Sequence, residues 1–251
     1  IKNAQLEEGQ KGLLFSLSNH KVLYANGIYD KVYPASITKI MTAMLALQSG
    51  KLNDTVTITQ DNVTLEDGSQ VCGFVAGDQV TLDQLLHCLL VYSGNDAASA
   101  IAEYVGGNTE NFVQMMNDYA AKLGCTGTHF SNPHGLQDEN HYTTPYDMAM
   151  LARKAMSEKV IREIVSTKSI SFKQQNTATS KINTSRYFTN TNLFLTSNDK
   201  ITYRKQSIPI KYDIVDGIKT GYTDLAGRCL LSSAVKNDMR VIAAVFKSFG
   251  T

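Results

Sequence analysis

Residues 34–44 read Pro-Ala-Ser36-Ile-Thr-Lys39-Ile-Met-Thr-Ala-Met, and the interpretation of the chain starts from this stretch. Apolar residues recur at helical spacing up to Leu47, and Gly50 follows, so the sequence predicts a helix that ends near Gly50. Ser36 and Lys39 would lie on the same face of that helix. A lysine can take the proton of a serine hydroxyl when burial or a nearby cation lowers its pKa. The spacing therefore predicts a nucleophile and its base.

The Ser-x-x-Lys spacing alone is weakly specific. Elsewhere it falls in a turn, in a polar loop and at the end of a strand-like run, whereas only Ser36 opens a helix. Without further motifs, an ordinary helix cap is the favoured interpretation of the Ser36 hydroxyl. The other three occurrences are Ser18 with Lys21, Ser197 with Lys200, and Ser233 with Lys236.

The composition is that of a globular protein. The 251 residues are 43% apolar and 19% charged, enough for a substantial core. A net charge of +1 gives no overall field that would favour nucleic acid or an anionic membrane surface. No signal region or membrane-spanning run is evident, and a start at Ile1 without Met suggests a processed or trimmed product. We expect no nucleic-acid partner.

No metal or cofactor is expected from the cysteine and histidine patterns. The scattered cysteines include no Cys-x-x-Cys pair, which favours buried thiols and leaves one or two disulfides open. A metal site formed by three histidines of one Gly/Pro-containing loop with Asp138 or Glu139 matches no common zinc spacing. Hydrogen bonds that order this loop are the favoured interpretation. The residues in question are Cys72, Cys88, Cys125, Cys229, His129, His134 and His141.

The order of elements predicts an α+β fold. Strand-like runs at 12–16 and 21–25 precede the Ser36 helix, a block of helices follows, and short runs rich in β-branched or aromatic residues fill the chain after about residue 166. An antiparallel sheet built from both chain ends, with a helical insert, fits this order. We expect one catalytic domain over 1–251, with a sheet lobe (1–60 and 166–251) and a helical lobe (61–165).

Two further motifs each occur once. Ser93-Gly94-Asn95 lies at a turn between two predicted helices, where a hydroxyl and a carboxamide could face one cavity. Lys219-Thr220-Gly221 follows a strand-like run and, on an edge strand, suits an extended peptide whose carboxylate is held by the lysine and threonine. Taken singly, the first could be a helix cap and the second a solvated strand end.

Together, in this order, the three motifs resemble those of penicillin-interacting serine enzymes. Residues 34–44, 85–98, 128–144 and 215–227 resemble the serine D-alanyl-D-alanine carboxypeptidases (peptidase S11-like), which are the low-molecular-mass penicillin-binding proteins. The resemblance implies a penicillin-binding/serine β-lactamase-like transpeptidase fold with its site between two lobes. It also implies removal of the terminal D-alanine from peptidoglycan stem pentapeptides and inhibition by β-lactam antibiotics.

The resemblance also implies catalytic roles for five residues. Ser36 would attack the carbonyl of the penultimate D-alanine and become the acyl-enzyme, and Lys39 would take its proton. Ser93 and Lys219 would help to pass a proton to the departing D-alanine. Asn95 would hold the substrate amide.

Substrate binding is implied for the strand after residue 215. Thr220 and Lys219 would bind the terminal carboxylate, and Gly221 would let the substrate approach closely. The backbone N–H groups of Ser36 and Tyr222 would form the oxyanion hole. Some members carry histidine where this chain has Tyr222, but only the backbone is needed there.

The family further implies an extracytoplasmic location in the cell envelope, with membrane association in the full-length protein. Many members add a C-terminal β-domain and a membrane-surface helix, and neither is present in the 251 residues, so any membrane contact is expected through segments missing here. The family also tends to place a substrate-contacting arginine shortly after the last strand, and we expect that position to lie beyond Thr251.

Two alternatives remain open. A catalytically weak penicillin- or peptidoglycan-binding module would become acylated but would not cleave peptides. A serine β-lactamase would share the Ser36 and Lys39 chemistry, yet the Glu-x-x-Leu-Asn segment of class A enzymes is missing, and Gly94 stands where those enzymes have aspartate.

Overall fold

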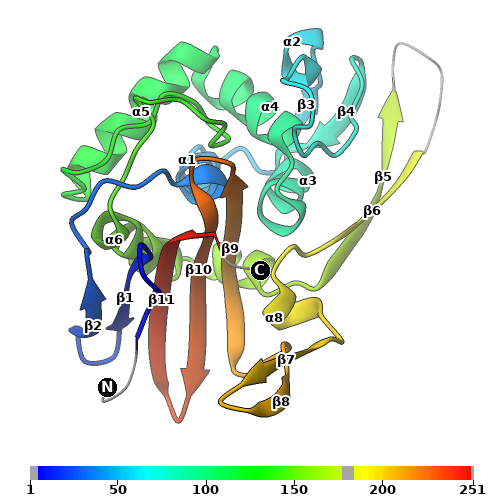
Figure 1. Cartoon of the computed structure of the whole chain (residues 1–251). Coiled ribbons are helices and arrows are strands. Elements are labelled where there is room, and N and C mark those ends of the chain that lie inside the picture. The colour runs from blue at the N-terminus through cyan, green and yellow to red at the C-terminus, as the bar shows by residue number, and fades with distance from the viewer. Residues whose placement is uncertain (1–4, 177–183, 250–251) are drawn as a thin grey trace.

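The fold is built on a five-stranded antiparallel sheet whose strands come from both ends of the chain (Figure 1). A computed structural model describes residues 5–176 and 184–249. The strand order is β2-β1-β11-β10-β9, so the first and last strands lie side by side. The strands are β1 (Lys11–Ser16), β2 (Lys21–Asn26), β9 (Val215–Thr223), β10 (Gly227–Lys236) and β11 (Met239–Ser248). The predicted α+β fold with a sheet from both chain ends is confirmed.

Burial alternates along the strands of this sheet, so one of its faces is directed toward the core. Leu231 of β10 and Ile242, Ala244 and Phe246 of β11 are completely buried, whereas their neighbours along each strand are more exposed. A turn at Asn237-Asp238 joins β10 to β11, and both residues have positive φ, as a two-residue hairpin of type I′ requires.

The helices pack on one face of the sheet and surround a central helix, α1 (Figure 1). Helix α6 contacts β1 and β11, α7 contacts β9, and α1 lies between α6 and the pair α4 and α5. No described helix has both the length and the apolar character needed to cross a bilayer. The helical elements are η1 (Ala35–Thr38), α1 (Lys39–Gln48), α2 (Gln60–Val63), α3 (Leu82–His87), η2 (Cys88–Tyr92), α4 (Asn95–Gly106), α5 (Thr109–Lys122), α6 (Pro145–Ala155), α7 (Lys159–Val165) and α8 (Leu193–Thr196).

Local capping explains where several of these helices begin. Thr81 and Gln84 form a capping box at the start of α3. Thr144 accepts a hydrogen bond from the Asp147 N–H, with Pro145 at the first helical position of α6. Gly50 follows α1 in the left-handed region, as expected for a helix stop.

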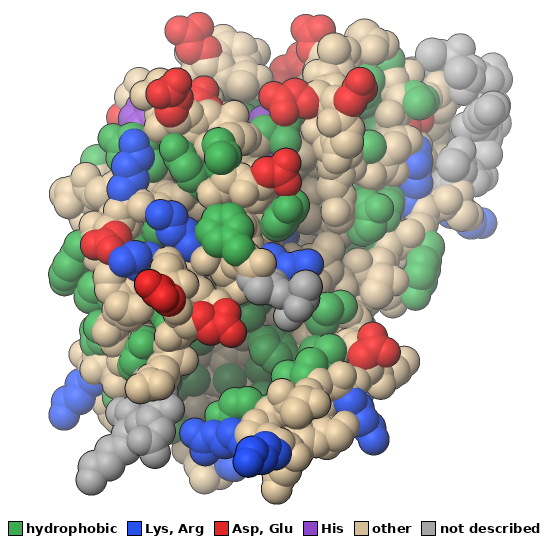
Figure 2. Space-filling view, viewed as in Figure 1, with side chains coloured by type: hydrophobic (Ala, Val, Ile, Leu, Met, Phe, Trp, Pro, Cys, Tyr) green, Lys and Arg blue, Asp and Glu red, His purple; other side chains and the backbone are tan. Residues whose placement is uncertain are grey.

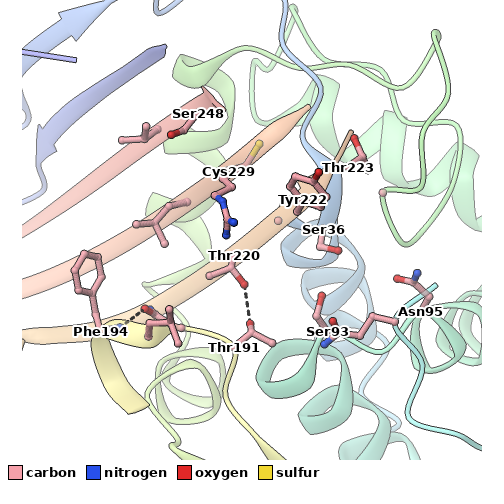
Figure 3. Close-up of a pocket in the computed structure, with 18 of the residues that line it drawn as sticks. Ser36, Ser93, Asn95, Thr191, Phe194, Thr220, Tyr222, Thr223, Cys229 and Ser248 are labelled. Atoms are coloured by element: carbon pink, nitrogen blue, oxygen red, sulfur yellow. Dashed lines mark hydrogen bonds between the residues drawn. The ribbon is translucent and has the colours of Figure 1, made fainter. Parts of the chain in front are cut away.

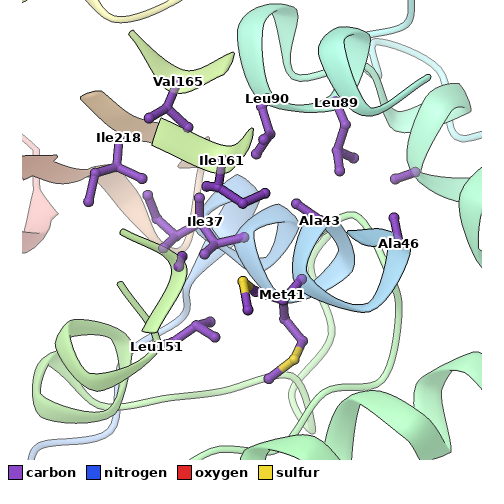
Figure 4. Close-up of a cluster of buried hydrophobic side chains, with 14 of the residues drawn as sticks. Ile37, Met41, Ala43, Ala46, Leu89, Leu90, Leu151, Ile161, Val165 and Ile218 are labelled. Atoms are coloured by element: carbon purple, nitrogen blue, oxygen red, sulfur yellow. The ribbon is translucent and has the colours of Figure 1, made fainter. Parts of the chain in front are cut away.

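The main hydrophobic core is centred on α1. Ile40, Met41 and Met44 of α1 are buried, and Figure 4 shows Ile37 and Met41 among side chains from η2, α6, α7 and β9. Because apolar residues cover the whole circumference of α1, the helix is enclosed by other elements. Packing of this kind fixes Ser36 and Lys39, which lie at the start of α1.

The chain after residue 166 departs from the prediction in one respect. The strands β5 and β6 pair with β3 and β4 in a separate four-stranded sheet, and β7 and β8 form their own hairpin. Asp78 links the two parts of the separate sheet, since its carboxylate accepts a hydrogen bond from Asn176 and pairs with Arg186. The strands are β3 (Thr55–Thr57), β4 (Asp78–Thr81), β5 (Ser169–Asn176), β6 (Thr184–Thr189), β7 (Lys200–Tyr203) and β8 (Gln206–Pro209).

Strands β5 to β8 therefore do not belong to the main sheet, although they lie within the predicted sheet lobe 166–251. A buried carboxylate needs a charged or hydrogen-bonding partner, and for Asp78 that partner comes from β5 and β6 rather than from β4 itself. Strand β6 ends at Thr189, and Asn192 caps α8 soon after it. The division into two lobes otherwise stays a prediction.

Candidate active site

Ser36 lies in the short 3₁₀ turn η1 that leads into α1. The preceding residue, Ala35, has a φ of +46°, a conformation in which backbone strain is common. Ser36 is half-buried and opens onto a cavity, whereas Lys39 is completely buried beneath it. The Nζ atom of Lys39 is 2.9 Å from Oγ of Ser36, so the predicted contact between the two side chains is present.

The hydrogen bonds of Lys39 can be made by a neutral amine. Nζ is 2.6 Å from Oδ1 of Asn95 and 2.8 Å from the carbonyl oxygen of His134, and both oxygens can only accept hydrogen bonds. A neutral amine has two N–H groups and one lone pair. When the N–H groups are donated to these two oxygens, the lone pair remains for the Ser36 hydroxyl.

Electrostatics act in the same direction. Burial lowers the pKa of Lys39 well below its usual value, and the charge of Lys219 lowers it further. A lysine with a lowered pKa is better suited to act as a general base. The pair thus has the geometry, and the lysine has the lowered pKa, that an activated serine requires.

The loop 131–136 supplies the backbone oxygen that positions Lys39. Thr42 donates a hydrogen bond to the Pro133 carbonyl at 2.6 Å, which fastens the loop to α1. Gly135 has a φ of +93°, and a Cβ there would lie 1.9 Å from the Ala35 carbonyl oxygen. Only glycine lets the loop approach η1 this closely.

The histidines around this loop form hydrogen bonds that order it. Nδ1 of His141 accepts from the Ser131 N–H at 3.0 Å, so its Nε2–H donates to Thr38 at 2.7 Å. His129 contacts the Asn140 carbonyl, and burial lowers the pKa of His134 to about 3 and that of His141 to about 4. Within residues 5–176 and 184–249, no group of histidine, cysteine or acidic side chains could hold a metal ion.

The Ser93-Gly94-Asn95 turn is held by the loop 68–74. Ser93 has a φ of +70°, ends a π-helical turn and lines the cavity. Asp96 accepts the Cys72 N–H at 2.8 Å, and Gln70 accepts the Asn95 N–H at 2.8 Å through its carbonyl oxygen. A Cβ on Gly94 would lie 2.4 Å from Sγ of Cys72, so the turn and the loop are in full contact.

The Lys219-Thr220-Gly221 motif lies on β9, the edge strand of the main sheet. Lys219 is buried, donates to the Thr220 carbonyl at 2.8 Å, and has a pKa lowered by burial to about 7. The Thr220 hydroxyl is 2.7 Å from that of Thr191. A Cβ on Gly221 would lie 3.0 Å from the Ser36 nitrogen, so the edge strand runs directly beside the nucleophile.

These segments surround one cavity of about 710 Å³ (Figure 3). Of the predicted residues, Ser36, Ser93, Asn95, Gly221 and Tyr222 line it together with Thr220, whereas Lys39 and Lys219 lie buried behind its wall. Figure 3 shows Ser36, Ser93 and Asn95 gathered on one side and Thr220 facing Thr191 on the other. An apolar extension continues toward α8 and the β7–β8 hairpin, where Figure 2 shows a hollow with hydrophobic side chains.

Several residues of the site were not predicted. The His134 carbonyl gives no sequence signal, because any residue supplies a backbone oxygen. Thr191 and Arg228 line the cavity but belong to no motif. The alternation along β10 could have placed Arg228 on the same face as Leu230, had the pairing of β10 with β9 been known.

All four cysteines are buried and free, as the favoured interpretation predicted. Burial raises the pKa of the Cys125 and Cys229 thiols to about 12. The pKa of Cys72 is raised first by a hydrogen bond with Cys88 and then by burial. Thiols of this kind are poor nucleophiles, which leaves Ser36 as the activated nucleophile of the cavity.

Comparisons with known proteins agree with this geometry. The sequence is 35% identical over 243 residues to D-alanyl-D-alanine carboxypeptidase DacF of Bacillus subtilis, covering 95% of this chain and 57% of that protein. It is 37% identical to DacC of Escherichia coli, covering 93% and 55%. The chain thus spans about half the length of these curated relatives. The Streptomyces K15 DD-transpeptidase superposes with a TM-score of 0.85 at 29% identity, covering 96% of this chain and 90% of that one.

The match with a family model covers almost the entire sequence. The model described as D-alanyl-D-alanine carboxypeptidase, peptidase family S11, matches residues 5–250. Together with the relatives above and the contact between Ser36 and Lys39, this match shows that the chain belongs to the D-alanyl-D-alanine carboxypeptidase family.

Proposed function

We propose that this chain is a serine D,D-carboxypeptidase that removes the terminal D-alanine from peptidoglycan stem pentapeptides. The observation that carries the proposal is the buried amine of Lys39, 2.9 Å from the Ser36 hydroxyl, with its two other contacts made to hydrogen-bond acceptors. Family membership supports the choice of substrate, since the relatives are named for this activity.

In the acylation step, the lone pair of Lys39 takes the Ser36 proton as Oγ attacks the carbonyl carbon of the penultimate D-alanine. The backbone N–H groups of Ser36 and Tyr222 stabilise the oxyanion that forms. The position of Gly221 beside the Ser36 nitrogen supports this role, because it brings the backbone of β9 next to that of η1.

Collapse of the tetrahedral intermediate breaks the peptide bond, and the departing D-alanine nitrogen needs a proton. Ser93 and Lys219 pass this proton from Lys39, while Asn95 holds the substrate amide. Water then attacks the ester, and the shortened peptide leaves. A β-lactam acylates Ser36 in the same way and stays, because no amine departs from the site.

The substrate lies extended along the edge strand β9, with its carboxylate toward Thr220 and Lys219. The whole protein acts outside the cytoplasm, where peptidoglycan is found, and any membrane association comes from segments outside these 251 residues. The two lobes predicted from the sequence act as one catalytic domain around the cavity.

Intact-mass measurement after incubation with a penicillin tests the nucleophile. We expect a stable adduct that peptide mapping places on Ser36 and that disappears in Ser36→Ala. Release of D-alanine from an acylated L-Lys-D-Ala-D-Ala peptide tests the hydrolysis. An adduct without D-alanine release would favour the binding module, and rapid turnover of the penicillin would favour a β-lactamase. A folded protein without an adduct would contradict the serine–lysine mechanism.

A further inference from the structure

The small net charge of the chain conceals two segments of opposite sign. Residues 51–150 contain 2 Lys or Arg against 13 Asp or Glu, whereas the rest of the chain contains 22 against 10. Figure 2 shows acidic side chains gathered at the end of the molecule where α2 and α5 lie, and basic side chains around β7 and β8 at the opposite end. An anionic ligand is therefore attracted to the end that carries the β7–β8 hairpin.

The hairpin is the most basic part of that end. Residues 200–211, which include β7 and β8, carry four cationic side chains and no carboxylate, and Asp199 and Asp213 flank them. All four cations are exposed, and none belongs to an ion pair formed within residues 5–176 and 184–249. Cations without a protein anion are available to an anionic ligand. They are Lys200, Arg204, Lys205 and Lys211.

The turn of the hairpin has an unusual pair of residues. Arg204 has a φ of +49° and Lys205 a φ of +65°, the conformation of a type I′ turn. Such turns favour Asn, Asp and Gly, because a longer side chain is strained in the left-handed region. Strained residues of this kind are concentrated at functional sites. The tip of the hairpin therefore carries two cations that the turn itself does not favour.

Packing does not explain the hairpin either. In the described part of the chain, β7 and β8 pair only with each other, and of their residues all but Ile208 are exposed. A lone two-stranded hairpin is at best marginally stable in water. Ile201 of β7 nevertheless lines the cavity, so the hairpin stands at the edge of the candidate active site.

We propose that the β7–β8 hairpin, together with Lys211, docks a linear anionic polymer of phosphodiester-linked units. Arginine and lysine both bind phosphate groups. Lys200 and Arg204 are about 13 Å apart along the strand, so a chain that follows the hairpin meets cations at several successive phosphates. A narrow arm of two strands suits such a chain, whereas a folded protein needs a broader surface with an apolar centre.

Docking goes beyond the proposed hydrolysis and does not depend on it. Because Ile201 lines the cavity, a polymer on the hairpin holds the enzyme with its active site beside the polymer. None of the four cations lines the cavity, so their replacement should leave the cleavage of a short peptide unchanged.

The test measures binding of fluorescently labelled poly(glycerol phosphate) by anisotropy at several salt concentrations. For four phosphate contacts, the logarithm of the affinity should fall with the logarithm of the salt concentration with a slope of about −3. In Arg204→Gln with Lys205→Gln, the slope should be about half as steep, and the affinity at low salt should fall about 30-fold.

A second variant separates charge from folding. Arg204→Asn with Lys205→Gly gives a type I′ turn its favoured residues, so the hairpin stays formed while the same two charges are lost. Its affinity should fall as far as that of the glutamine pair. The matched control is Lys122→Gln with Arg153→Gln, which removes two exposed cations from α5 and α6 and should bind like the wild type.

Three results would overturn the proposal. One is an equal affinity for the wild type and both hairpin variants, and another is an equal loss in the control. The third is tighter binding to polyglutamate or to phosphatidylglycerol vesicles than to poly(glycerol phosphate), which would assign the hairpin to an acidic polypeptide or to a membrane surface. Binding needs no turnover, so the outcome is the same whether or not the protein releases D-alanine.

Discussion

Asn95→Asp probes the protonation state of Lys39. The substitution keeps the shape of the side chain but puts a negative charge where Oδ1 lies 2.6 Å from Nζ. An ammonium stabilised by this carboxylate donates all three of its protons and offers no lone pair to Ser36. We therefore expect a protein that folds but acylates slowly at neutral pH.

The magnitude follows from the geometry. At 2.6 Å and an effective dielectric constant of about 20, the attraction amounts to about 6 kcal/mol. The cost of burying the carboxylate offsets part of this, and a net gain of about 3 kcal/mol raises the pKa of Lys39 by about two pH units. On the acid side of its profile, acylation should then be about 100-fold slower at a given pH.

The assay is the rate of penicillin acylation between pH 5 and 10, measured for wild type, Asn95→Asp and Asn95→Ala. The alanine variant removes the acceptor without adding charge, so its profile should be lower but not displaced to higher pH. An aspartate variant whose profile is lowered equally at all pH values would refute the argument that Lys39 acts as a neutral base.

Two further predictions concern stability. His134 and His141 have pKa values lowered to about 3 and 4, so the unfolded state binds more protons below about pH 6.5 and the free energy of unfolding should fall as the pH drops toward 4, by up to about 1.4 kcal/mol per unit for each histidine. In His141→Gln, the free energy of unfolding measured with urea should fall less steeply as the pH drops. An unchanged dependence on pH would exclude His141 as a contributor. Gly94→Ala places a Cβ 2.4 Å from Sγ of Cys72 and should lower the free energy of unfolding by about 1–3 kcal/mol. Adding Cys72→Ala should recover part of that loss, and strict additivity of the two changes would argue against the contact.

Sequence reasoning succeeded where local chemistry decides the structure. Thr81, Thr144 and Gly50 mark helix ends because capping depends on the side chain or φ of a single residue. The turn at Asn237-Asp238 was predictable for the same reason. The three motifs also meet around one cavity, although the sequence alone could show only their order.

The remaining features depend on contacts between segments far apart in the chain. The pairing of β5 and β6 with β3 and β4 was missed. It depends on the contacts of the buried Asp78 carboxylate with Asn176 and Arg186, and the hydrophobic periodicity of a sequence does not indicate such contacts. The His134 carbonyl and the Thr191 hydroxyl were missed because their roles arise only when their segments meet Lys39 and Thr220.

The neighbouring positions of the first and last strands have a kinetic consequence. Leu13 lies opposite Ala244, so nearly the whole chain forms the loop that this pairing closes. Contacts of such long range slow folding, because the entropy of loop closure is lost before the pairing stabilises the sheet. During synthesis, β1 cannot pair with β11 until nearly the whole chain has been made. The edge strand beside Ser36 belongs to the same sheet, so activity should appear only in the last stage of folding.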